Sequence, residues 1–191
     1  MPYLILIRHA NSQPIAGRSP HRWTLSDEGR RKCTLLVERL RPYGIKHIYS
    51  SDEPKALQTA GQIAFYLGHL PSTLDDQLRE TRRENVPFYD DELAFCQAIQ
   101  AAMNQPQRLL YGEETFEAAR IRFTEAVKRI VANKNETVAL VSHGTILSLY
   151  IASVIETNPF DLWKLLDMPA YAVFSLPDMK LNEICFSMPQ L

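Results

Sequence analysis

Two histidines follow apolar runs that are typical of buried β-strands. His9 comes directly after Arg8 at the end of an apolar run, residues 3–7, and His143 comes shortly after a second run, residues 137–141. Runs of this length that are rich in Ile, Leu and Val predict strands buried on both faces. If the two strands lie side by side, both imidazoles reach one edge of the sheet. That edge is where open α/β folds bind their ligands.

Cationic side chains accompany the two histidines at the ends of other predicted elements. They are Arg8, Lys55 and the group Arg79, Arg82 and Arg83. Fixed cations neutralise the charge of a tetrahedral phosphate dianion, and a neutral imidazole nitrogen can attack phosphorus. This set of residue types therefore indicates phosphoryl chemistry that needs no metal.

Motifs for other chemistries are missing from the sequence. It contains no HxH, HExxH or Asp-rich cluster for a metal, no GxSxG nucleophile elbow, and no P-loop or GxGxxG motif. Arginines beside the histidines would also repel a cation. We therefore expect neither a metal site nor a cofactor.

The segments between these motifs predict an α/β protein. A helix is expected to begin after the N-cap residue Ser26 and to end at Gly44, because its apolar residues have helical spacing. A short strand over residues 47–50 and a helix with Pro54 in its first turn follow. Residues 171–186 predict a strand, a turn and a strand that close the edge of the sheet. The order of elements favours three layers, with a mostly parallel central sheet flanked by helices on both faces.

The length of 191 residues predicts a single domain, residues 1–191, with a full hydrophobic core. The least regular stretch is residues 81–111, which we interpret as an insertion that covers the site. Long irregular stretches of this kind often carry function. Selectivity is expected in this segment and in the loop after His9.

Composition gives no indication of a nucleic-acid or membrane partner. The formal net charge of −1 gives no long-range reason to bind nucleic acid or an anionic membrane. Three widely spaced cysteines without a CxxC pair fit a reducing compartment. The N-terminal apolar run is too short for a signal peptide or a membrane span. We expect a cytoplasmic protein whose partner is a small phosphorylated molecule; its oligomeric state stays open.

Several motifs together resemble the histidine phosphatase superfamily, which includes the phosphoglycerate mutases. Leu-Ile-Arg-His-Ala at residues 6–10 is similar to the family's Arg-His-Gly motif, and Val-Ser-His-Gly at residues 141–144 to its second histidine motif. Tyr-Ser-Ser-Asp-Glu-Pro-Lys-Ala-Leu-Gln-Thr-Ala at residues 49–60 resembles the segment Ser-Ser-x-x-x-Arg-Ala-x-Gln-Thr-Ala. Leu-Arg-Glu at residues 78–80 lies where the family carries a glutamate. The matches occur in family order from residue 4 to about residue 150.

The resemblance implies a phosphoglycerate mutase-like fold and a role for each matched residue. His9 would be the nucleophile that becomes a phosphohistidine, and His143 would contact the phosphoryl oxygens. Arg8 and Lys55 would neutralise charge, and Glu80 would protonate the leaving oxygen. Candidate substrate-binding residues are Asn11, Ser12, His21 and Arg83. Glu84 is the second candidate for the acid.

Two residues depart from the family pattern. Ala10 replaces the usual glycine, and Lys55 replaces the expected arginine. Lysine keeps the charge but loses the planar fork that binds two phosphate oxygens at once. Our hypothesis is that turnover is reduced, or that another arginine (Arg18, Arg22 or Arg83) supplies the missing donors.

The favoured interpretation is a histidine phosphatase that hydrolyses a small phosphorylated metabolite without a metal. One alternative is a mutase-type phosphoryl transferase, because the resemblance does not separate the two activities. The other is a weakly active or non-catalytic protein that binds phosphorylated ligands, with Lys55 marking the loss of turnover.

Overall fold

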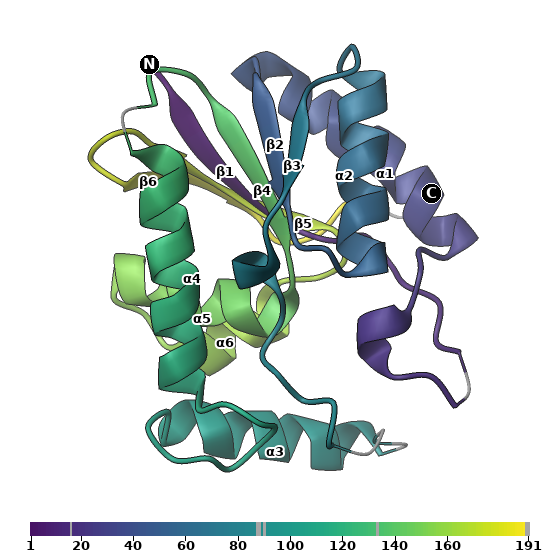
Figure 1. The fold of residues 1–191 in the computed structure, drawn as a ribbon, viewed down its shortest axis with the longest axis vertical. Coiled ribbons are helices and arrows are strands. Elements are labelled where there is room, and N and C mark those ends of the chain that lie inside the picture. Colours follow the sequence, from purple (N-terminus) through teal and green to yellow (C-terminus); the bar gives the residue numbers. More distant parts are fainter. Residues whose placement is uncertain (16, 87–88, 90, 133, 190–191) are drawn as a thin grey trace.

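The computed structural model describes residues 1–15, 17–86, 89, 91–132 and 134–189. Six strands of the described residues form one sheet in the order β3-β2-β4-β1-β5-β6 (Figure 1). The strands are β1 (Tyr3–Arg8), β2 (His47–Ser50), β3 (Ser72–Leu74), β4 (Val138–Ser142), β5 (Ala170–Ser175) and β6 (Lys180–Cys185). The first four in space are parallel, and β5 and β6 are antiparallel to their neighbours. The predicted mostly parallel sheet and its closing pair of strands are confirmed.

Helices cover both faces of this sheet. They are α1 (Asp27–Leu40), α2 (Pro54–Tyr66), α3 (Glu92–Asn104), α4 (Phe116–Val131), α5 (Gly144–Ile155) and α6 (Pro159–Leu165). Helices α1 and α2 lie on one side and α4, α5 and α6 on the other, whereas α3 lies beyond one end of the sheet (Figure 1). The three-layer α/β architecture expected from the sequence is therefore present.

Successive side chains of the central strands point to opposite faces of the sheet, so the hydrophobic core is divided into two layers. In β1, Leu4 and Leu6 belong to the cluster under α4 and α5, whereas Ile5 and Ile7 belong to the cluster under α1 and α2. All four side chains are at most 1% exposed. A strand buried on both faces has no polar position along its length. The first polar side chains of β1 are therefore those at its carboxyl end.

Local sequence signals set the helix starts near this end of the sheet. The Ser26 hydroxyl caps α1 by accepting from the Gly29 amide at 3.0 Å. A Cβ at Gly29 would lie 2.1 Å from the Asn11 carbonyl oxygen, so only glycine lets the loop after β1 pack against α1. Pro54 occupies the first turn of α2, where its missing N–H is tolerated.

The segment predicted as an insertion, residues 81–111, contains α3. Residues 87, 88 and 90 of this segment lie outside the described part of the chain. Ile99, Ala102 and Met103 of α3 pack in a separate small core with Phe160 of α6. Within the described ranges, each helix is too short or too polar to cross a membrane.

Candidate active site

The two histidines lie together at the carboxyl edge of the sheet. Strands β1 and β4 pair in parallel with Arg8 opposite Ser142, and the His9 amide donates to the Ser142 carbonyl at 3.0 Å. This register brings the rings of His9 and His143 to a centroid separation of 5.1 Å. The predicted meeting of the two strand-end imidazoles is confirmed.

Hydrogen bonding fixes the tautomer of His9. Its Nδ1 lies 2.8 Å from the Ala10 carbonyl oxygen. Since a carbonyl oxygen only accepts, Nδ1 carries the proton and Nε2 keeps its lone pair. Burial lowers the pKa of His9 well below its ordinary value of 6.5, and the neighbouring His143, Lys55 and Arg8 also disfavour its protonation. His9 is thus a neutral imidazole with a nucleophilic Nε2 at neutral pH.

His143 has polar partners at one ring nitrogen and, among the described residues, none at the other. Its Nε2 lies 2.9 Å from the Ser51 hydroxyl and 3.4 Å from Oε1 of Glu53. Its Nδ1 is buried and has no hydrogen-bond partner among the described residues. Burial lowers the pKa of His143 to about 4, although Glu53 acts in the opposite direction. His143 is therefore neutral at pH 7, with one nitrogen available to a ligand.

Arg8 extends from the last position of β1 along the start of α5. Its guanidinium donates to the Leu166 carbonyl, while its Nε is buried without a partner among the described residues. A Cβ at Gly144 would lie 2.8 Å from Cζ of Arg8. The glycine after the second histidine is therefore what leaves room for the guanidinium.

Lys55 is buried and already paired. Its ammonium group donates to Oε2 of Glu53 at 2.8 Å and to the Pro20 carbonyl at 2.7 Å. Glu53, the residue before α2, is 4% exposed and also lies 3.2 Å from Nδ1 of His21. Although burial raises the pKa of this carboxyl, His143, His21 and Lys55 together hold it well below its usual range. The site thus contains a buried carboxylate that the motif analysis did not single out.

Glu80 is bound by backbone amides rather than exposed as a free acid. Its carboxylate accepts from the amides of Thr81, Thr145 and Ile146 at 2.9–3.0 Å, two of them in the first turn of α5. Burial acts to raise its pKa, but Arg83, His143 and the amides outweigh it and lower the pKa. Glu80 is therefore ionised in the free protein. Glu84, the other candidate acid, is exposed and lines a separate hollow on the surface.

Among the described arginines proposed to compensate for Lys55, Arg83 alone lines the cavity that contains His9. Arg22 is exposed, and Arg18 lines the neighbouring surface hollow. Of the group predicted with Arg83, Arg82 is exposed and Arg79 forms an ion pair with Asp52 outside the cavity.

The remaining predicted substrate-binding residues occupy three different environments. Ser12 lines the cavity, whereas the Asn11 carbonyl is used by Ser26 at the start of α1. His21 lies behind the cavity against Glu53. The structure therefore places Ser12 and Arg83 at the cavity, whereas Asn11 and His21 do not line it.

The cavity has a volume of about 140 Å³ and combines a charged floor with apolar walls. Arg8, Lys55, Glu80 and Arg83 form the charged part, beside the two neutral imidazoles of His9 and His143. The walls come from distant parts of the chain and include Trp23, Phe95, Trp163 and Met168. Sequence reasoning missed these four, because their positions depend on how the loops and α6 fold over the sheet. Within the described ranges, no three His, Cys, Asp or Glu side chains are grouped to hold a metal ion.

Fold and site together define an α/β protein with two adjacent histidines and buried cationic side chains at the carboxyl edge of its sheet. The model of the histidine phosphatase superfamily (branch 1) matches residues 4–178. The chain belongs to that superfamily, as its motifs indicated.

Individual relatives share the architecture at low sequence identity. Phosphoglycerate mutase-like protein 4 of Arabidopsis thaliana is 31% identical over 134 residues, which cover 66% of this chain and 58% of that protein. YhfR of Bacillus stearothermophilus has a TM-score of 0.77 at 23% identity and covers 95% of each chain. The mycobacterial glucosyl-3-phosphoglycerate phosphatase has a TM-score of 0.79 at 19% identity, over 99% of this chain and 100% of that one. These two solved structures show a shared fold.

Proposed function

We propose that the protein is a metal-independent phosphomonoesterase that acts on a small phosphorylated metabolite through a phosphohistidine at His9. The observation that carries the proposal is the hydrogen bond from Nδ1 of His9 to the Ala10 carbonyl. It leaves the lone pair on Nε2, in a cavity that also contains Arg8, Lys55 and Arg83. Such a group is an activated nucleophile beside fixed cations.

In the first step, Nε2 of His9 attacks phosphorus and the bond to the ester oxygen breaks. The leaving oxygen needs a proton, and Glu80 is the carboxyl group that lines the cavity near both histidines. An entering phosphate dianion raises the pKa of Glu80, because like charges disfavour ionisation. Glu80 thereby takes up a proton with the substrate and passes it to the leaving oxygen, becoming a carboxylate again.

In the second step, water attacks the phosphohistidine. The Glu80 carboxylate takes the proton of this water, the P–N bond breaks, and inorganic phosphate leaves. The lowered pKa of Glu80 in the free protein suits this role as a base. Two relatives of the same fold support hydrolysis, since they are named as phosphatases for glucosyl-3-phosphoglycerate and alpha-ribazole phosphate.

His143 supplies charge to the phosphoryl group only after protonation. Its unpartnered Nδ1 can donate to a phosphoryl oxygen once the imidazole is cationic. The dianion favours this protonation, and Glu53 at 3.4 Å from Nε2 stabilises the resulting cation. His143 is therefore proposed to gain its proton on ligand binding.

A second candidate, a weakly active protein that binds phosphorylated ligands, is favoured by one contact. The pairing of Lys55 with Glu53 reduces the positive charge that the phosphoryl group meets. A protein of this kind would bind phosphate without releasing it from esters.

The proposal is tested by phosphate release from p-nitrophenyl phosphate in the presence of a metal chelator. We expect release by the native chain and its loss in His9→Ala. His69→Asn is the matched control, because His69 is exposed and lies in a left-handed conformation that asparagine tolerates. Thermal stabilisation by phosphate without any release would favour the binding protein instead. A mutase would move the phosphate to a second position of its substrate rather than release it.

A further inference from the structure

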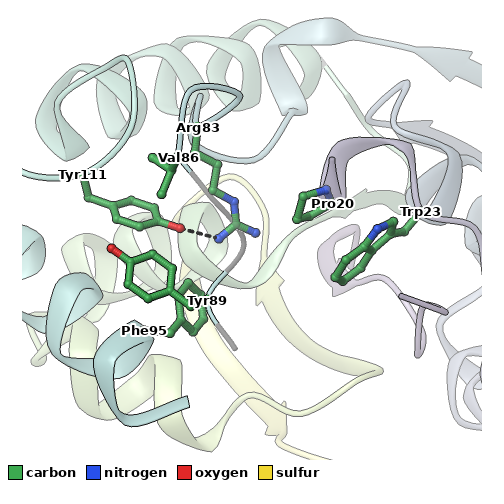
Figure 2. A pocket seen from close by; sticks show the side chains of 7 residues that line it. All are labelled: Pro20, Trp23, Arg83, Val86, Tyr89, Phe95 and Tyr111. Atoms are coloured by element: carbon green, nitrogen blue, oxygen red, sulfur yellow. Dashed lines mark hydrogen bonds between the residues drawn. The ribbon is translucent and has the colours of Figure 1, made fainter. Parts of the chain in front are cut away.

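A second cavity adjoins the one that contains His9. Four residues line both: Pro20, Trp23, Arg83 and Phe95. Val86, Tyr89 and Tyr111 complete the second cavity. Figure 2 shows two facing walls, with Pro20 and Trp23 on one side and the residues of the 81–111 segment on the other. A group attached to a phosphoryl at His9 can therefore extend past the four shared side chains into the second cavity.

The wall of the 81–111 segment is a cluster of aromatic rings. The ring centroids of Tyr89, Phe95 and Tyr111 lie 5.9–6.4 Å from one another. The second cavity has a volume of about 170 Å³. An apolar engineered cavity of about 150 Å³ is known to hold one benzene ring. The size of this cavity therefore suits one aromatic ring.

Arg83 lies at the junction of the two cavities. Its guanidinium donates to the Tyr111 hydroxyl at 3.2 Å and lies 5.7 Å from the centroid of the Phe95 ring. Its Nε is buried and has no partner among the described residues. In Figure 2 the guanidinium stands between Tyr111 and Pro20. Arg83 can therefore donate a hydrogen bond to a phosphoryl or ester oxygen. The aromatic side chains still line one face of the second cavity when it does so.

The chemistry of the lining disfavours a sugar. None of the described side chains that line the second cavity is a carboxylate or an amide. A polyhydroxylated group would lose hydrogen bonds to water there and regain few of them, whereas an apolar ring loses none.

We infer that the second cavity is a leaving-group subsite for a phosphate monoester of an alcohol that carries a single aromatic ring. This inference rests on the proposed phosphatase function, since it names the substrate class of the same site. Burying a phenyl ring in such a cavity favours the ring-bearing ester over a short alkyl ester.

The test compares 2-phenylethyl phosphate with ethyl phosphate. Both leaving groups are primary alkoxides, so their chemical reactivity is closely matched and the ring is the main difference. We expect kcat/KM to be at least tenfold higher for the phenylethyl ester. Val86→Phe fills the cavity and Tyr89→Ala removes part of its aromatic wall, so each should lower this ratio at least fivefold. Phe65→Ala is the matched control: Phe65 is a 56% exposed aromatic residue of α2 that lines neither cavity.

A binding measurement separates this inference from the phosphatase proposal. The probes are 3-phenylpropylphosphonate and propylphosphonate, which replace the ester oxygen with carbon and cannot be hydrolysed. Tighter binding of the phenyl compound by at least tenfold, weakened in Val86→Phe and Tyr89→Ala, supports the subsite even if neither ester is turned over. In that case only the phosphatase proposal fails.

Other results overturn the subsite. Turnover of both esters at similar kcat/KM would leave the phosphatase proposal intact and remove the subsite. If the ratio of the two kcat/KM values is high but neither variant changes it, the selectivity arises elsewhere in the protein, and the subsite is ruled out. Absence of turnover together with equal or undetectable binding of the two phosphonates would overturn both proposals.

Discussion

The ammonium group of Lys55 lies 2.8 Å from a carboxylate oxygen of Glu53, and both residues are at most 5% exposed. Lys55 stands at the position where the motif resemblance leads one to expect an arginine. Part of the positive charge of the phosphate pocket is therefore neutralised by the chain itself before any ligand arrives. A buried pair of this kind is costly to break on one side only.

Removing the charge of Glu53 should strengthen phosphate binding. In Glu53→Gln the amide oxygen can still accept from the Glu80 amide, as Oε1 does now at 3.1 Å. Lys55 would then direct its full charge to the ligand, and we expect this gain at the 2.8 Å ion pair to exceed the loss of the longer 3.4 Å contact that favours protonation of His143. We expect the inhibition constant of inorganic phosphate to fall at least threefold, and the free energy of unfolding to fall by about 3 kcal/mol because Lys55 is left unpaired.

Asp52→Asn is the matched control for this change. Asp52 precedes Glu53 and also loses one negative charge, but it pairs with Arg79 outside the cavity. The inhibition constant should stay unchanged in this variant. An equal change in both variants would mean that overall charge, and not the Glu53 carboxylate in the pocket, controls phosphate binding.

Lys55→Arg tests whether the missing planar fork limits turnover. A guanidinium can bind two phosphoryl oxygens at once, whereas an ammonium acts as a point charge. We expect kcat/KM for p-nitrophenyl phosphate to rise severalfold in Lys55→Arg. If kcat and KM both stay at their native values, Lys55 does not limit the reaction and Arg83 already supplies the second set of donors.

Gly144→Ala should displace the guanidinium of Arg8. The added Cβ would lie 2.8 Å from Cζ and 2.9 Å from Nε of Arg8, both at the end of a flexible side chain. The fold should therefore persist while kcat/KM falls by about 100- to 1,000-fold, as expected for the loss of one charge-stabilising donor group. Circular dichroism and steady-state kinetics measure the two effects.

Gly61→Ala is the control for the glycine substitution. Gly61 lies within α2, and a Cβ added there would meet no side chain or other segment of the described residues within 4 Å, so an alanine fits without a clash. It should raise the free energy of unfolding by about 0.5–1 kcal/mol and leave kinetics unchanged. Native activity in Gly144→Ala would show that Arg8 can shift without loss of function.

The two buried histidines should make stability fall in mild acid. The pKa of His143 is lowered to about 4 by burial, whereas an unfolded histidine titrates near 6.5. Below pH 6.5 the unfolded chain binds a proton that the native state excludes, so the free energy of unfolding falls with pH. We expect His143 to contribute a loss of about 2 kcal/mol between pH 7 and pH 5.

Urea unfolding of the native chain and of His143→Gln at both pH values measures this loss. The variant should lose less stability than the native chain, and His69→Asn should lose as much. The lowered pKa values of Glu53 and Glu80 have the same sign but act in a lower window, as the pH falls below about 4.5. Equal losses in the native chain and in His143→Gln would contradict the assigned pKa of His143.

Local patterns in the sequence were sufficient to predict the sheet and the proximity of the two histidines. The apolar runs before His9 and His143 specify strands, and a parallel pairing of two such strands places both imidazoles at one edge. Ser26 and Pro54 mark helix starts through hydrogen bonds and backbone geometry within a few residues. Such signals need no knowledge of tertiary contacts.

Contacts between distant segments decide the rest of the site. Glu53 is acidic and precedes a helix, which by itself is typical of an exposed residue. Its burial follows from the approach of His21 and of the Glu80 amide, 32 and 27 positions away in the chain. Phe95 and Trp163 likewise line the cavity only because α3 and α6 pack together. These contacts between distant segments cannot be predicted from the spacing of residues along the chain.

A phosphohistidine mechanism requires that Nε2 of His9 form a covalent bond to phosphorus during turnover. The most direct measurement is a rapid quench with base during hydrolysis of p-nitrophenyl phosphate, followed by mass spectrometry of the peptide that contains His9. We predict one added phosphoryl group on His9 that is stable in base and lost in acid, and that His9→Ala does not form. Full turnover with no phosphoryl group on His9, or the same group on another residue, would contradict the account.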